Sequence, residues 1–144
     1  MYFATWLEQY QFERFVLDLA IATLKYGGVT SQLSTYQFLD PIDAWGLPKY
    51  PDKTLILNPE ANITEGLHNF IQTNEIYLRE PDAWLGTWIN PNTRCCYVDV
   101  TLICPRLEEA RREAIQRSQE GKRPVLALYN FKHNKTLYLN QPTM

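Results

Sequence analysis

The sequence has little of what disulfide frameworks and metal sites are built from. Its 144 residues include three cysteines and two histidines, and the cysteines occur as one adjacent pair and one single residue. This spacing matches neither a disulfide framework nor the paired ligands of a zinc site. No His-x-x-x-His or Asp-x-Asp motif occurs either. We therefore expect reduced cysteines, no bound metal and no cofactor.

Long apolar runs are also missing. No stretch reaches the roughly 18–20 apolar residues that a membrane span needs, and Asp18 interrupts the most apolar run, residues 15–24. The chain does not open with the basic segment and short apolar run of a secretory signal. We expect a cytoplasmic protein that does not associate with a membrane.

A third absence concerns catalysis. No glycine-rich phosphate loop occurs, and no local motif joins a nucleophilic serine or cysteine to its base. We therefore predict no catalytic residues and expect a non-enzymatic protein, with a small enzyme as an alternative.

What the sequence does contain is a readable series of elements from Trp84 to Leu139. Asn90-Pro91-Asn92-Thr93 has turn chemistry, and the run that follows it is rich in β-branched and aromatic residues. Pro105 ends that run and is suited to open a helix, which Gly121 ends. The series predicts a ββαββ unit. Its elements are strands at 84–89 and 94–104, a helix at 106–120, and strands at 124–131 and 136–139.

Side chains alternate between the two faces of the predicted strand at 94–104. One face is wholly apolar, and we expect the 106–120 helix to lie on it, because the alanines of that helix allow a close approach. The other face is mixed. The apolar face consists of Cys96, Val98, Val100, Leu102 and Cys104, and the mixed face of Cys95, Tyr97, Asp99, Thr101 and Ile103.

The first 82 residues predict two helices and a loop. The helix at 2–26 has apolar positions near the 3.6-residue period. Its apolar stripe is wide, which predicts burial on more than one side, so we expect the helix to belong to the core or to contact a partner. The helix at 62–78 begins with Asn62 as N-cap, and Asn74 lies on its inward face. Between them, residues 29–59 are broken by prolines, and only 54–57 predict an edge strand. The apolar positions of the first helix are Phe3, Trp6, Leu7, Tyr10, Phe15, Val16, Leu19 and Ala22.

Charge divides unevenly between the two halves. Residues 1–82 carry five Lys/Arg against eleven Asp/Glu, a net charge of −6, whereas residues 83–144 carry nine against five, a net charge of +4. The first interpretation is that the halves pack together and complement one another. An alternative is a nucleic-acid surface on the basic half, although acids on the same helix dilute it. Its basic residues are Arg106, Arg111, Arg112, Arg117, Lys122 and Arg123.

Asp99 is the most interesting single residue, because it is an acid in mid-strand with Tyr97 on the same face. Trp84 and Trp88 share one face of the neighbouring strand, and the register could place them beside this acid. Such an acid with an aromatic rim could bind a cationic group or a base, or it could instead be solvated or hydrogen-bonded to a loop at the open side of the sheet. Trp45, in the proline-broken loop, either packs that loop onto the core or anchors a partner, because tryptophan is enriched at interface hot spots. A small enzyme would instead need Asp99, Tyr97 and His68 to converge in one pocket.

Three short segments form a series within residues 84–139. They read LGTWINPNT at 85–93, YVDV at 97–100 and EEA at 108–110. The series resembles a segment of uncharacterised phage and mobile-element proteins, which has Gly-x-Trp, a turn, Tyr-Leu-Asp-Val and a helix with Glu-Ala. The chain departs from it at 94–96, where the segment usually has a glycine, and at Asn130, where we expect an aspartate. The resemblance implies an accessory domain of bacterial or phage origin and assigns no activity.

Together these observations predict a single α+β domain over residues 1–144, with a helical and proline-rich half at 1–82 and the ββαββ half at 83–144. We expect an antiparallel sheet of about four or five strands packed by helices. The leading hypothesis is a non-enzymatic protein-interaction or accessory module that binds a protein partner or itself. The alternatives are a small enzyme or nucleotide-binding protein with a site near Asp99 and Tyr97, and nucleic-acid binding through the basic residues of 106–123.

Overall fold

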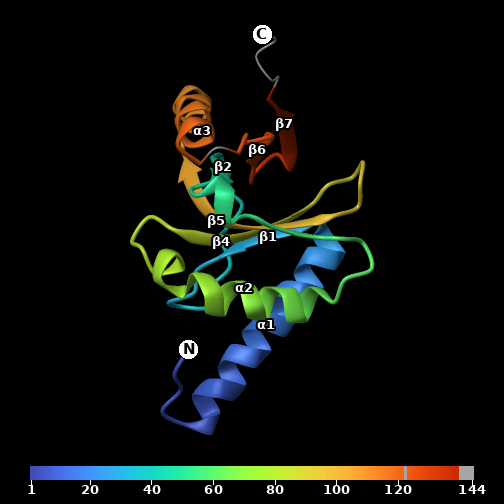
Figure 1. The fold of residues 1–144 in the computed structure, drawn as a ribbon, viewed down its shortest axis with the longest axis vertical. Helices are drawn as coiled ribbons and strands as arrows, with labels where there is room; N and C mark the ends of the chain where they lie inside the picture. The colour runs from blue at the N-terminus through green and yellow to red at the C-terminus, as the bar shows by residue number, and fades with distance from the viewer. Residues whose placement is uncertain (122, 140–144) are drawn as a thin grey trace.

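The computed structural model describes residues 1–121 and 123–139. Within these residues the chain forms three α-helices, one short 3-10 helix and one antiparallel sheet of seven strands (Figure 1). The predicted α+β class and antiparallel sheet are confirmed, whereas the strand count exceeds the expected four or five. The elements in chain order are α1 (Trp6–Tyr26), β1 (Gly28–Ser31), β2 (Trp45–Pro48), η1 (Pro51–Lys53), β3 (Leu55–Leu57), α2 (Ile63–Leu78), β4 (Trp84–Ile89), β5 (Cys96–Cys104), α3 (Leu107–Gly121), β6 (Ala127–Asn130) and β7 (Lys135–Tyr138).

β5 is the central strand of the sheet. β4 pairs along one edge of β5, while β3 pairs with its first half and β2 with its second half on the other edge. β1 continues the sheet beyond β4, and β6 and β7 continue it beyond β2. Figure 1 shows the resulting curl, in which β6 and β7 stand on the opposite side of the β1–β4–β5 layer from α1 and α2.

The apolar face of β5 is buried as predicted, but two layers of helices share it. Val98 and Val100 belong to the cluster under α1 and α2, together with Cys96. Leu102 and Cys104 belong to a second cluster under α3. The expectation that the 106–120 helix covers the whole face is therefore wrong. α3 buries only a narrow stripe of two alanines, and a twisted strand of nine residues runs beyond the reach of such a helix.

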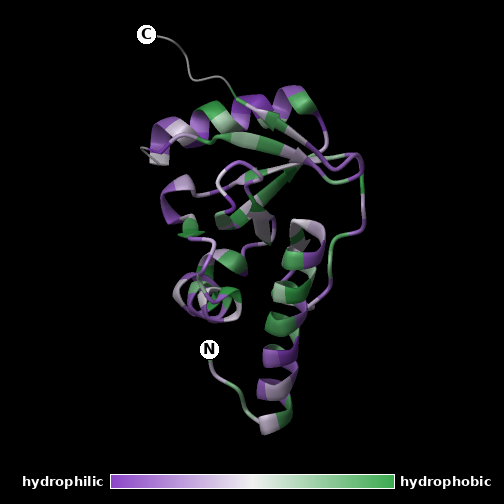
Figure 2. Ribbon diagram, turned by 90° about the vertical axis from the view of Figure 1, so that its right-hand side faces the viewer, coloured by the Kyte–Doolittle hydropathy of each residue, from purple (hydrophilic) through white to green (hydrophobic). Residues whose placement is uncertain are grey.

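α1 begins at Trp6, where the Thr5 side chain accepts a hydrogen bond from Glu8 N, and it ends at Gly27, whose φ of 83° suits a left-handed C-terminal position. Its middle and C-terminal half pack on the sheet, while its N-terminal half extends beyond it (Figure 1, Figure 2). Among the apolar positions that the sequence predicts for this helix, Phe15, Val16 and Leu19 are buried in the core, whereas Trp6 and Tyr10 are 78% and 57% exposed. No helix in the described part of the chain is long and apolar enough to cross a membrane.

α2 confirms the cap and the inward amide that the sequence predicts. Asn62 Oδ1 accepts a hydrogen bond from Glu65 N at 3.1 Å, which satisfies one of the free N–H groups of the first turn. Asn74 is buried, and its amide donates to the Phe70 carbonyl at 3.0 Å. The backbone at Asn74 leaves helical geometry, with φ −116° and ψ 20°, so this residue marks a kink in the helix.

The proline-broken segment at 29–59 holds more structure than expected. β3 confirms the edge strand predicted at 54–57, but β1 and β2 were not predicted. Both are only four residues long, and they contain glycine and, in β2, a proline, which are depleted in strands. Their stability comes from pairing with β4 and β5, residues that lie far away in the sequence.

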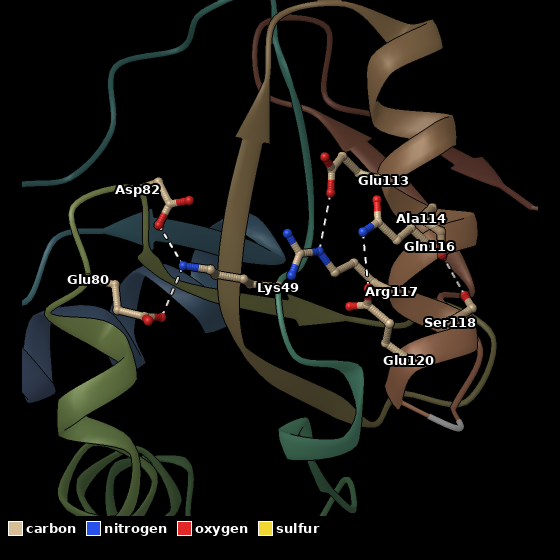
Figure 3. Close-up of polar contacts among 9 residues, drawn as sticks. All are labelled: Lys49, Glu80, Asp82, Glu113, Ala114, Gln116, Arg117, Ser118 and Glu120. Atoms are coloured by element: carbon tan, nitrogen blue, oxygen red, sulfur yellow. Dashed lines mark hydrogen bonds and ion pairs between the residues drawn. The ribbon is translucent and has the colours of Figure 1, made fainter.

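A polar cluster ties the end of β2 to the turn between α2 and β4. Lys49 Nζ donates to Glu80 at 3.0 Å and to Asp82 at 2.6 Å, and Tyr50 OH donates to Glu80 at 2.7 Å. Figure 3 shows Lys49 pointing between the two carboxylates. Burial acts to lower the pKa of Lys49, but the bonds to Asp82 and Glu80 outweigh it and raise that pKa. The cluster is a structural clamp of charged lysine and carboxylates.

On α3, Arg117 Nε forms an ion pair with Glu113 Oε2, one turn earlier in the helix, at 3.2 Å (Figure 3). The same view shows Ser118, whose hydroxyl donates to the Ala114 carbonyl at 2.6 Å. Ser118 Oγ also accepts from Val125 N at 2.9 Å, which fixes the chain after α3 against the helix. That segment leads directly into β6.

Candidate functional site

The mixed face of the sheet borders a cavity of about 580 Å³. β1, β4, β5 and β2 form its floor, and the segment from Arg123 to Phe131 forms much of its opposite wall. Its size falls in the range of small-molecule sites, about 300–1,000 Å³. The cavity lies on the other side of the β1–β4–β5 layer from the cluster under α1 and α2, because neighbouring residues of each strand face opposite ways.

Asp99 is the acid of this cavity. It projects from the middle of β5, opposite Gly86 of β4, and it is partly buried. The hydroxyl of Thr54 donates a hydrogen bond to its Oδ1. Burial raises the pKa of Asp99 to about 6, and the Thr54 hydrogen bond and the charge of Arg123 only partly oppose this rise. The carboxylate therefore stands in an environment that favours its neutral form more than water does.

Arg123 is the second charged residue of the wall, and Asp99 and Arg123 are the only charged side chains among the described lining residues. Its Nη1 donates to the carbonyl oxygen of Thr54 at 3.2 Å. Thr54 thus connects the two charged residues. Its hydroxyl hydrogen-bonds to the Asp99 carboxylate, and its carbonyl accepts from the Arg123 guanidinium. The polar end of the cavity contains one acceptor group and one cation, fixed by a residue that lies between them.

The apolar part of the wall is aromatic. The rings of Trp88 and Tyr97 are cross-strand neighbours, with centroids 5.4 Å apart. Trp88 also meets Tyr138 of β7, at 6.3 Å, so this tryptophan joins the sheet floor to the β6–β7 hairpin. On the hairpin side, the rings of Tyr129 and Phe131 pack edge to face at 5.8 Å. Such faces suit a flat or apolar ligand body.

Two glycines let the walls approach closely. A Cβ added at Gly46 would lie 2.6 Å from the ring of Phe131, so the absence of a side chain lets that ring lie over β2. A Cβ added at Gly86 would clash with the Thr101 hydroxyl oxygen. Gly86 therefore leaves room for the Thr101 side chain on the floor, next to Asp99.

The structure brings together some of the predicted site residues. Asp99, Tyr97 and Trp88 line the cavity together, as the expected register would allow. Trp84 faces the same side of β4 but pairs with Thr101 at the far end, outside the described lining. Trp45 is the first residue of β2 rather than part of a loop, and it packs on the cluster under α3.

His68 lies on the helix-covered side of the sheet. It belongs to α2, and its ring packs against Phe12 of α1 with centroids 5.6 Å apart. It does not line the cavity that Asp99 and Tyr97 border, within the residues described. The convergence of all three groups that a small enzyme would need is therefore not found.

The basic residues considered for nucleic-acid binding are dispersed. Arg117 pairs with Glu113, and Arg123 lines the cavity. Lys122 lies outside the described residues. Arg106, Arg111 and Arg112 are exposed on α3 and the turn before it.

The cysteines are in environments that oppose thiolate chemistry. Burial raises the pKa of Cys96 and of Cys104 to about 11, so both remain thiols at neutral pH. Cys95 precedes β5 and is partly buried. Among residues 1–121 and 123–139, no three His, Cys, Asp or Glu side chains gather in a way that could hold a metal ion.

The sequence did not single out Thr54 or the aromatic residues of the hairpin, and it indicated Arg123 only as part of a possible nucleic-acid surface. Arg123 carried a signal, because it is a basic residue just beyond the end of a helix and before a strand, but its orientation depends on the path of the following segment. Thr54 is the first residue of the predicted edge strand, and only the pairing of β3 with β5 brings it to Asp99.

Comparison of the chain with protein-family models finds no match, and neither the curated proteins nor the solved structures give one. The resemblance of residues 84–139 to phage and mobile-element segments stays a prediction. The geometry of the cavity is therefore the basis for assigning a function.

Proposed function

We propose that this protein binds a small organic molecule in the cavity between the sheet and the β6–β7 hairpin. The observation that carries the proposal is a partly buried carboxylate, Asp99, on the floor of a largely apolar cavity of about 580 Å³. Pockets of this kind, apolar with a few converging polar groups and a residue of perturbed pKa, are the usual sites of ligand recognition.

The chemistry of the walls defines the ligand class. Trp88 and Tyr97 offer aromatic surface for a flat or apolar body, and Asp99 offers a hydrogen-bond acceptor at the polar end. At neutral pH a carboxyl group with a pKa of about 6 is mostly ionised, so it favours an N–H or O–H donor over another acceptor. Arg123 reduces the net negative charge, so a neutral donor suits the site as well as a cation does.

The test uses one- and two-ring aromatic compounds in matched amine, amide, hydroxyl and carboxylate forms. Binding is measured by the shift in melting temperature and by quenching of tryptophan fluorescence. We expect the donor-bearing forms to bind and the carboxylate forms to bind at least tenfold more weakly.

The variant Asp99→Asn tests which residue is responsible. Loss of a charge-assisted hydrogen bond of about 1.5–3 kcal/mol corresponds to a reduction in affinity of roughly 10- to 100-fold. Asp18→Asn is the matched control, because Asp18 is an exposed acid on α1, across the sheet from the cavity. Equal affinity of wild type and Asp99→Asn for every compound, or equal binding of donors and carboxylates, would rule out the proposed site.

Acid–base catalysis at Asp99 is a second candidate, favoured by the pKa of about 6. A general acid or base works best when its pKa lies near the working pH, and burial is the usual way to raise that of a carboxyl group. If a compound from the binding series is converted, the rate should depend on a group with a pKa near 6 and should be lost in Asp99→Asn. An unchanged compound after prolonged incubation would leave ligand binding as the function.

A further inference from the structure

α1 carries a line of exposed apolar side chains on the face opposite its buried one. At 100° per residue, five of these side chains fall within a sector about 60° wide, across the helix from Phe12, Phe15 and Leu19. This accounts for the apolar width of the helix seen in the sequence: one stripe packs on the protein and the other faces outward. The outward stripe consists of Trp6, Tyr10, Leu17, Ile21 and Leu24, which are 47–78% exposed.

The stripe has the spacing of a seam between two helices. Tyr10, Leu17 and Leu24 recur every seven residues, and Trp6 and Ile21 fill intermediate positions. A narrow line of this kind is typical of helices that pair side by side, whereas a helix on a globular core has a broader face. Its exposed area is roughly 600 Å², given aromatic side chains of about 150–250 Å² each. A patch of that size exceeds the scattered apolar residues of an ordinary surface.

We propose that a second copy of this chain covers the stripe, with the two α1 helices parallel about a two-fold axis that runs along them. Two copies would bury about 1,200 Å² in total, the lower limit for a stable interface, so a dimer in the micromolar range is expected. The interface is isologous: each stripe residue lies near its own counterpart in the other copy.

Charge supports this choice of partner. Glu13 and Arg14 interrupt the stripe at its middle and flank it on opposite edges, at about 50° to either side. A two-fold axis along the helices sets the Glu13 edge of one copy against the Arg14 edge of the other, and this happens twice. An antiparallel pair would instead bring like edges together. The stripe also lacks the basic rim of helices that lie on anionic lipid surfaces, because α1 carries three acids and two basic residues.

The experiment is sedimentation equilibrium of the full chain at 1–200 µM. Wild type is expected to approach the mass of a dimer as its concentration rises, and Leu17→Glu is expected to stay monomeric. At concentrations too low for dimerisation, the two proteins should have the same melting temperature. Ile76→Glu is the matched control, because Ile76 is 82% exposed but lies on α2. It should dimerise as wild type does. A monomeric wild type at 200 µM, whether or not it binds lipid vesicles, would overturn the proposal.

A charge exchange tests the arrangement itself. E13R should weaken dimerisation several-fold, because it sets two positive edges against each other, and E13R/R14E should restore it. In a Cys95→Ser background, Trp6→Cys should form a disulfide-linked dimer on mild oxidation, since the parallel arrangement places residue 6 of one copy beside residue 6 of the other. Failure of the double exchange to restore affinity, or no cross-link at residue 6, contradicts the parallel pair.

Discussion

Replacing Asp99 by asparagine should make the protein more stable at neutral pH. Burial raises the pKa of this carboxyl group from its ordinary 3.8 to about 6. One pKa unit corresponds to about 1.4 kcal/mol, so the ionised group costs about 3 kcal/mol of folding free energy at pH 7. Asparagine has nearly the same shape, carries no charge, and its Oδ1 can still accept the hydrogen bond from Thr54.

The pH dependence of this difference follows from the raised pKa. The folded protein holds the proton more tightly than the unfolded chain, so the cost is absent well below pH 3.8 and grows as the pH rises through about 6. The free energy of unfolding of the variant should therefore exceed that of wild type by about 3 kcal/mol at pH 7 and by about 0.5 kcal/mol at pH 4. Glu80 and Asp82 have lowered pKa values and titrate oppositely, but they are common to both proteins and cancel in the comparison.

The assay is urea denaturation of wild type and Asp99→Asn, followed by circular dichroism at 222 nm between pH 4 and 7.5. Circular dichroism is preferred because Trp88 lines the same cavity and its fluorescence would report local changes. The decisive quantity is how the difference in free energy of unfolding between the two proteins changes with pH. A difference that does not change with pH would refute the assignment of a raised pKa, as would a variant that loses stability relative to wild type as the pH rises.

Four further substitutions test the packing of the fold by urea denaturation. Gly86→Ala should lower the free energy of unfolding by about 1–3 kcal/mol, because its Cβ would meet the Thr101 hydroxyl. Gly121→Ala, whose Cβ would make ordinary van der Waals contacts at 3.4–3.6 Å, should raise it by about 0.5 kcal/mol. Lys49→Met should cost about 1 kcal/mol at pH 7 and less at pH 3, since its carboxylate partners have lowered pKa values and contribute stability that is lost as they protonate. Ser31→Ala should gain about 1 kcal/mol, because the Ser31 hydroxyl is buried without a hydrogen-bond partner among the described residues; an unchanged or lower stability would contradict this.

The elements that the sequence predicts well are those whose pattern is local. The alternation from Cys96 to Cys104 places five apolar side chains on one face, and all five are buried. The prolines and turn residues around the helix at 106–120 set its limits within a residue, and the same holds for the helix at 62–78. In each case the signal lies in residues that are close together along the chain.

The features that could not be predicted depend on contacts between distant segments. β1 and β2 have no strand-like composition of their own, and they form because β4 and β5 offer free edges. The same limit explains α1, whose outward stripe has the same period as its buried one, so periodicity alone could not tell which face meets the sheet. The sequence predicted the half of the candidate site that the mixed face of β5 provides, including Asp99. It could not predict the other half, because the β6–β7 hairpin is placed there by the pairing of β2 with β6.

Folding alone gives little reason for a carboxylate at position 99. Small domains have a total free energy of unfolding of about 5–15 kcal/mol, so a cost near 3 kcal/mol is a large fraction of it. An asparagine or threonine would accept the Thr54 hydrogen bond without that cost. Groups that reduce stability in this way are typical of sites where a charge is needed for binding or proton transfer. The energetic disadvantage of Asp99 is therefore itself an argument that the cavity, rather than the core, determines which residue stands there.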